Sequence, residues 1–98
     1  MNQEQADRYD RESGIIAAAI VPSLPVEART YIESVLEIGD PAFAVDLALQ
    51  GALEFDLVIP VDIRSNIDAF VVLLTEIGAG DVDRIRHWTE QVKFSVGL

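Results

Sequence analysis

The chain has 98 residues, of which 50% are hydrophobic, and its formal net charge at pH 7 is −10. This length suits one domain with one core, and the apolar content excludes a disordered composition. Cysteine is absent, which excludes disulfide bonds, thiolate nucleophiles and zinc sites with thiolate ligands.

The sequence carries no visible export or membrane signal. Its longest apolar run, residues 15–21, stops at Pro22, whereas a membrane-spanning helix needs about 20 apolar residues. A signal peptide would also need basic residues before its apolar part, and residues 1–14 mix acidic and basic side chains instead. We therefore expect a cytoplasmic protein.

Short segments with Gly, Pro, Ser and Asp divide the chain, at residues 22–25, 39–41, 60–62 and 78–81. The clearest of them is Gly39-Asp40-Pro41. Glycine can adopt the left-handed conformation that ends a helix, Asp can cap the amides of the next helix, and Pro suits a first turn. The same reasoning predicts N-caps at Ser23, Asp62 and Asp81 and a helix end at Gly78. Five helical segments result.

The first two helical segments cover residues 5–20 and 25–38. The first has apolar residues at three- and four-residue spacings, but Gly14 weakens its middle by about 1 kcal/mol relative to Ala. We expect residues 1–8 to fray. The second segment has apolar and polar residues on opposite sides, which is typical of an amphipathic helix.

The third segment, residues 41–56, is apolar over most of its surface. Its polar residues Asp46, Gln50 and Glu54 follow one another at intervals of four and form one stripe. A helix with so narrow a polar stripe is predicted to lie at the centre of a bundle, with Leu53 among its apolar residues. The stripe is either a solvated face or an interaction face.

The fourth segment, residues 63–77, carries Ile67, Phe70 and Leu74 at helical spacing. A strand over residues 70–74 is an alternative, but the length of the segment and its capping residues favour a helix. The fifth segment, residues 81–92, offers Trp88 to a core.

The tail at residues 93–98 is expected to be loose or extended. The predicted fold is thus all-α, a four- to five-helix bundle with short connections, in a single domain over residues 1–98.

Catalytic motifs are missing from the sequence. His87 is the only histidine, and its place next to Trp88 puts it on the solvated side of the fifth segment. The serines occur in no nucleophile-elbow pattern, and residues 78–80 lack the Lys and Ser or Thr of a phosphate-binding loop. We expect no enzyme activity, no metal and no cofactor.

Acidic residues are concentrated in the middle of the chain. Residues 33–76 contain nine acidic side chains and one basic side chain, Arg64. Such a body repels nucleic acid and anionic membranes and attracts basic partners over a Debye length of about 8 Å at physiological salt. The alternative is that the acids only keep a small protein soluble.

Turn and core residues in the centre of the chain follow a distinctive order. The elements of this order are Leu24-Pro25-x-Glu27, Ile38-Gly39-Asp40, Ala44, Leu47-Ala48, Leu53-x-Phe55, Val58-Ile59-Pro60-Val61-Asp62, Ile67 and Leu74. The order resembles that of the small helical immunity proteins of bacterial polymorphic toxin systems. The most similar types are the Maf-type and contact-dependent inhibition immunity proteins related to the colicin D immunity type. The resemblance covers residues 22–78.

This resemblance implies an immunity protein that binds and neutralises a cognate toxin. The toxin would be a nuclease or another enzyme with a basic surface, and its active site or substrate surface would be covered. The acidic body agrees with such a partner, because opposite charges speed association. The candidate toxin-binding residues are Glu37, Asp40, Asp46, Glu54, Phe55, Asp56 and Asp62, with Leu57 as a further apolar anchor.

A second interpretation is a helical regulatory or adaptor subunit. It is based on the wide apolar stripe of the fourth segment, which includes Val72 and Leu73. In either case the free protein is expected to be a monomer or a weak homodimer.

Overall fold

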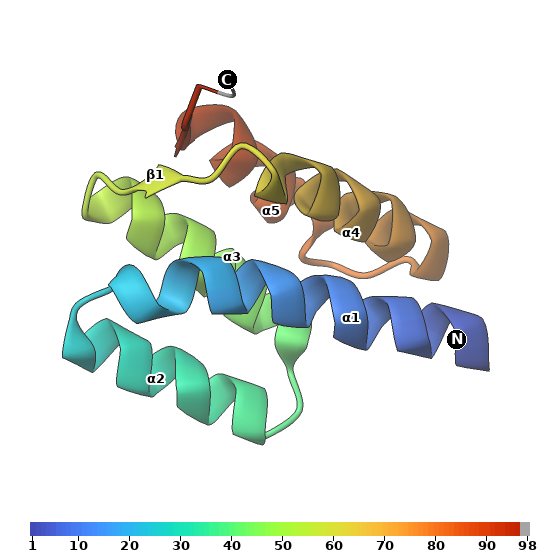
Figure 1. Ribbon diagram of the computed structural model, residues 1–98. Coiled ribbons are helices and arrows are strands. Elements are labelled where there is room, and N and C mark those ends of the chain that lie inside the picture. Colours follow the sequence, from blue (N-terminus) through green and yellow to red (C-terminus); the bar gives the residue numbers. More distant parts are fainter. Residues whose placement is uncertain (97–98) are drawn as a thin grey trace.

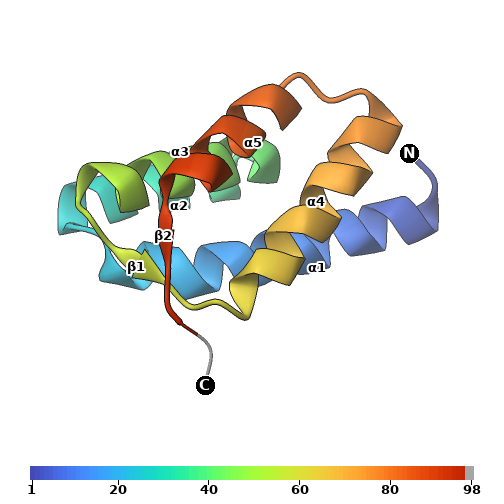
Figure 2. The same ribbon diagram turned by 90° about the horizontal axis from the view of Figure 1, so that it is seen from above.

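The computed structural model describes residues 1–96, and most of them are helical (Figures 1 and 2). The helices are α1 (Gln3–Ile20), α2 (Val26–Glu37), α3 (Pro41–Glu54), α4 (Ile63–Ile77) and α5 (Val82–Gln91). A 3-10 turn, η1 (Val21–Ser23), follows α1, and two short strands, β1 (Val58–Ile59) and β2 (Lys93–Phe94), follow α3 and α5. The predicted all-α bundle is confirmed. Over residues 1–96, none of the helices combines the length and the hydropathy that a bilayer crossing requires.

Helix α3 is the central element of the bundle. It packs against α1, α2 and α5, while α4 packs against α1 and α5 (Figure 2). Four apolar residues of α3 are completely buried: Ala44, Val45, Ala48 and Leu49. Because alanine side chains are short, neighbouring helices can approach α3 closely on more than one side.

Gly51 of α3 allows a further close approach. A Cβ atom at this position would lie only 2.9 Å from Cδ2 of Leu24. Leu24 is buried and precedes α2, so its side chain fixes the start of α2 on α3. A larger residue at position 51 would require the Leu24 side chain to shift.

Three helices end at a residue in the left-handed conformation. Gly39 (φ 85°) and Gly78 (φ 70°) do so as predicted, and Asp56 (φ 54°) does so after α3. The amide of Leu57 then donates a hydrogen bond back to Ala52 O at 2.8 Å, which is the Schellman arrangement. Asp56 therefore helps to end α3, at a backbone conformation that is easier for glycine.

Of the predicted N-caps, Asp40 makes the expected capping bond, because its side chain accepts a hydrogen bond from the amide of Phe43 at 3.3 Å. Asp62 and Asp81 precede α4 and α5 but make no capping bond. Their backbones are already helical, whereas a capping residue is normally extended. Ser23 lies within η1, and Pro25 precedes α2 instead. The predicted N-cap positions of Asp62 and Asp81 are thus confirmed without the predicted capping bonds, and the prediction for Ser23 was wrong.

Both ends of the described chain are better attached than the sequence predicts. Helix α1 begins at Gln3, and a capping box between Asn2 and Gln5 closes the turns that we expected to fray. Strand β2 pairs in parallel with β1, and the amide of Ser95 donates to Ile59 O at 2.9 Å. The predicted loose tail is thus part of a small sheet at its start, and residues 97–98 of that prediction lie outside the described residues.

Candidate functional site

Asp46, a predicted toxin-binding residue, lies inside the protein. Its exposed fraction is 0%, so the interpretation that it belongs to a solvated face was wrong. Trp88 Nε1 donates a hydrogen bond to Asp46 Oδ1 at 2.7 Å, and Gln50 Nε2 donates to the same oxygen at 3.1 Å. Helix α5 therefore covers the side of α3 on which Asp46 lies.

Arg84 of α5 supplies the positive charge for this buried carboxylate. Its Nε atom lies 2.9 Å from Asp46 Oδ2, and its own side chain is 57% exposed. Within residues 1–96, Oδ2 accepts no hydrogen bond, so the guanidinium compensates the charge mainly through proximity. A buried carboxylate with no cation beside it would be costly. Asp46, Arg84 and Trp88 thus form a polar link between α3 and α5, which we call the Asp46 link.

The other predicted binding residues are exposed but do not form one surface. They lie at the end of α2, at the two ends of α3 and before α4: Glu37, Asp40, Glu54, Phe55, Asp56 and Asp62. The 14 residues of α3 span about 20 Å, which separates Asp40 from Glu54. Asp56 is already paired, because Lys93 Nζ lies 2.6 Å from its Oδ1. Leu57, the further predicted anchor, is partly buried against the core.

At the C-terminal end of α3, a groove separates this helix from α2. Tyr31 of α2 and Phe55 after α3 line this groove, together with Glu54 and Gln50. Its volume is about 120 Å³, and Tyr31 and Phe55 are 55% and 41% exposed. We call this surface the aromatic groove. Exposed aromatic residues in a partly enclosed site are characteristic of protein interfaces.

Tyr31 was not among the residues that the sequence singled out. The buried face of α2 is formed by Ile32 and Val35. Tyr31 lies at the edge of this face and is exposed. Glu27, one turn earlier, borders Tyr31 on the surface of α2. A signal was present, because an aromatic residue outside the apolar side of an amphipathic helix has little core to fill.

Near the N-terminal end of α3, negative charge gathers around the half-buried Tyr9. Burial raises the pKa of the Tyr9 hydroxyl, and the carboxylates of Asp40, Asp81 and Asp10 raise it further, while a hydrogen bond from the Ala42 amide lowers it. The three carboxylates thus all act on the hydroxyl group of Tyr9. We call them the acidic end of α3.

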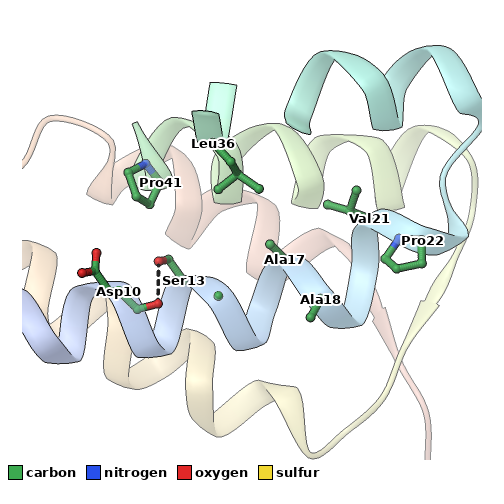
Figure 3. Close-up of a pocket in the computed structure, with 9 residues that line it drawn as sticks. Asp10, Ser13, Ala17, Ala18, Val21, Pro22, Leu36 and Pro41 are labelled. Atoms are coloured by element: carbon green, nitrogen blue, oxygen red, sulfur yellow. Dashed lines mark hydrogen bonds between the residues drawn. The ribbon is translucent and has the colours of Figure 1, made fainter. Parts of the chain in front are cut away.

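A second groove lies between α1 and the side chains of Leu36 and Pro41 (Figure 3). Its volume is about 440 Å³, and it is lined by Asp10, Ser13, Gly14, Ala17, Ala18, Val21, Pro22, Leu36 and Pro41. Most of these side chains are small or apolar, and Asp10 is the one charged residue among them. We call this surface the α1 groove.

Metal-binding geometry is not present in the described residues. Over residues 1–96, no group of three or more His, Asp or Glu side chains could hold a metal ion. His87 is exposed on α5, as expected. No protein-family model, curated protein or solved structure matches this chain.

Proposed function

We propose that this protein is an immunity protein that neutralises a cognate bacterial toxin with a basic surface, and that it binds the toxin through the aromatic groove. The observation that carries the proposal is the presence of Tyr31, Phe55 and Glu54 in one groove between two helices. The resemblance of residues 22–78 to immunity proteins supplies the class of partner.

The aromatic groove has the chemistry that a basic partner needs. Aromatic side chains supply a large contact area and are frequent among the residues that dominate binding energy. A Lys or Arg side chain of the toxin can pair with Glu54 and also contact the faces of Tyr31 and Phe55. Apolar contact then gives specificity that charge alone does not provide.

The acidity of the whole chain supports the same partner. A net charge of −10 attracts a basic enzyme from a distance and raises the rate of association. An acidic protein seated on a basic active site or substrate surface also keeps nucleic acid away from it. This mechanism requires binding only, with no chemistry on the part of the immunity protein.

The proposal is tested with the C-terminal domain encoded by the adjacent upstream gene. Tyr31→Ala and Phe55→Ala are each expected to raise the Kd for this domain about 10- to 100-fold, measured by calorimetry. Both side chains are substantially exposed, so folding should be preserved and is checked by circular dichroism. Cells that express the toxin should lose protection in parallel with the loss of affinity.

Two exposed residues elsewhere on the protein serve as controls. Val72→Ala removes an apolar side chain that is 54% exposed on α4 and should leave the Kd unchanged. Glu54→Lys should weaken binding more at low salt than at high salt, and Glu4→Lys, an equal charge change on α1, should weaken it less. The proposal fails if the upstream gene encodes no toxin, or if its product does not bind with nanomolar affinity.

The alternative function, a homodimeric regulatory subunit, retains one supporting observation. Val72 is 54% exposed on α4, but Leu73, the other residue that widened the stripe, is fully buried. Charged residues surround Val72, including Asp68, Arg86 and Glu90. A monomer by light scattering at high micromolar concentration would remove this alternative, whereas a dimer that Val72→Asp dissociates would favour it.

A further inference from the structure

The α1 groove and the aromatic groove lie on different flanks of α2. Leu36 borders the α1 groove and Tyr31 borders the aromatic groove. They are five positions apart, so their side chains leave the helix axis about 140° apart. The α1 groove is therefore a second surface, one that the proposed function does not use.

The lining of the α1 groove suits an apolar side chain better than a polar small molecule. The Ser13 hydroxyl is directed at the backbone, at 2.6 Å from Tyr9 O and 3.2 Å from Asp10 O (Figure 3 shows the second contact). Small-molecule sites usually present several converging polar groups. Here the Asp10 carboxylate is the one ionised group, and the rest of the lining is small or apolar.

Charge at one end of the groove specifies what flanks the apolar side chain. Within residues 1–96, Asp10 forms no ion pair. Asp40 is next to Pro41 of the groove wall, and it acts on Tyr9 together with Asp10 and Asp81. A Lys or Arg side chain of a partner can therefore pair with the Asp10 carboxylate at this end of the groove.

The shape of the groove suits a helix. The groove follows α1 from Asp10 to Pro22, a length of about 18 Å. Gly14 and Ala18 lie one turn apart on the lining of the groove and have little or no side chain, so another helix can approach α1 closely there. Apolar side chains one turn apart on such a helix would lie along the groove.

We propose that the α1 groove binds an amphipathic basic helix of another protein, with apolar side chains in the groove and a Lys or Arg on Asp10. The inference goes beyond the proposed function, because it names a different surface and does not require the partner to be a toxin.

Synthetic helical peptides of defined composition test this proposal directly. The probe is an 18-residue amphipathic peptide of Leu and Lys, compared with a Leu and Glu peptide and with a Ser and Lys peptide of equal charge. The Leu and Lys peptide is expected to shift the amide resonances of Gly14, Ala18 and Leu36 in NMR spectra. The other two peptides should leave these resonances unchanged, because one lacks the cation and the other lacks the apolar side chains.

Position 14 offers a matched pair of variants. Gly14 is exposed, and a Cβ atom at this position meets no heavy atom within 4 Å, so we expect both Gly14→Ala and Gly14→Leu to fold. Gly14→Leu fills the groove and is expected to weaken peptide binding at least about tenfold, whereas Gly14→Ala should have little effect. Asp10→Asn should weaken binding and reduce its salt dependence more than Glu4→Gln does.

Several outcomes would overturn the proposal. They are equal binding of the Ser and Lys peptide, resonance shifts confined to residues outside the groove, and wild-type affinity in Gly14→Leu. A wild-type dimer that Gly14→Leu dissociates would show instead that a second copy of the chain fills the groove. Toxin binding lost on Tyr31→Ala but kept on Gly14→Leu would leave the proposed function intact while the peptide experiment decides the α1 groove separately.

Discussion

Of the three helices that pack on α3, α5 and α2 are attached to it in different ways. Helix α5 is joined through the Asp46 link, in which a buried carboxylate accepts a hydrogen bond from Trp88 and lies beside Arg84. Helix α2 packs on α3 through apolar side chains, and its buried residues are Ile32 and Val35. The polar residues of the interface between α3 and α5 thus contact one another.

This difference indicates which side of α3 is available for binding. Asp46 is completely buried, so a partner could contact its carboxylate only by displacing α5 and breaking the Asp46 link. The interface with α2 leaves the aromatic groove open and keeps Tyr31, Phe55 and Glu54 accessible. Asp46 therefore belongs to the packing of α5 on α3, whereas Glu54 remains exposed in the groove that we propose as the binding surface.

The largest expected effect is the loss of the Asp46 link. Asp46→Ala removes the acceptor of the Trp88 hydrogen bond and leaves Arg84 without its partner, at a cost of about 3 kcal/mol in the free energy of unfolding. Urea denaturation measures this cost. Glu54→Ala, on the same helix but exposed, should change the free energy by no more than about 0.5 kcal/mol.

If both variants had the same small effect, the difference between the two sides of α3 would not hold. Asp46→Asn sharpens the result, because it keeps an oxygen for Trp88 Nε1 but removes the charge that Arg84 compensates. Its cost should lie between those of Asp46→Ala and the wild type.

The two aromatic residues that α5 and α2 present provide a second, smaller contrast. Trp88→Phe deletes the hydrogen bond to Asp46 and is expected to cost about 2 kcal/mol. The hydroxyl of Tyr31 makes no hydrogen bond within residues 1–96, so Tyr31→Phe should cost less than about 0.5 kcal/mol. Thermal unfolding of both variants tests this contrast. A cost for Tyr31→Phe as large as that for Trp88→Phe would mean that α2 also depends on polar contacts.

Helix positions were predictable from the sequence because their signals are local. Helix α4 has the predicted bounds, and Gly39 and Gly78 adopt the left-handed conformation that ends a helix. These features depend on the preferences of single residues and their immediate neighbours. The pairing of β2 with β1 depends on residues 35 positions apart, such as Val58 and Lys93, and no local signal reports it.

The direction in which α3 faces its neighbours could not be predicted in the same way. An almost wholly apolar helix has a weak periodicity, which does not show that Leu53, one of its apolar residues, is 38% exposed. The polar stripe was also misleading, because positions four apart drift by about 40° around a helix. Asp46 and Glu54 therefore point about 80° apart, the first toward α5 and the second into the aromatic groove.

The smallest expected effect concerns pH and the start of α5. Burial raises the pKa of Asp81 above its ordinary value of 3.8, Asp40 and Asp46 raise it further, and Arg84 opposes them. The folded protein thus binds this proton more tightly than the unfolded chain does. Stability should fall as the pH rises from about 3.8 through the folded pKa, and the loss should be complete above that pKa.

Asp81→Asn should therefore be slightly more stable than the wild type at pH 7, and this advantage should disappear as the pH falls to the ordinary pKa of Asp. Urea unfolding across this pH range measures the difference. Asp83→Asn makes the same change in net charge at a side chain on α5 that is 92% exposed. It therefore separates the local effect on stability at Asp81 from the effect of lowering the overall negative charge of the protein. If the two variants gained equal stability at pH 7, repulsion over the whole acidic body would explain the gain. A gain specific to Asp81→Asn would mean that the negative charge of Asp81 lowers the folding stability locally. A basic partner that binds at the acidic end of α3 could offset this loss of stability.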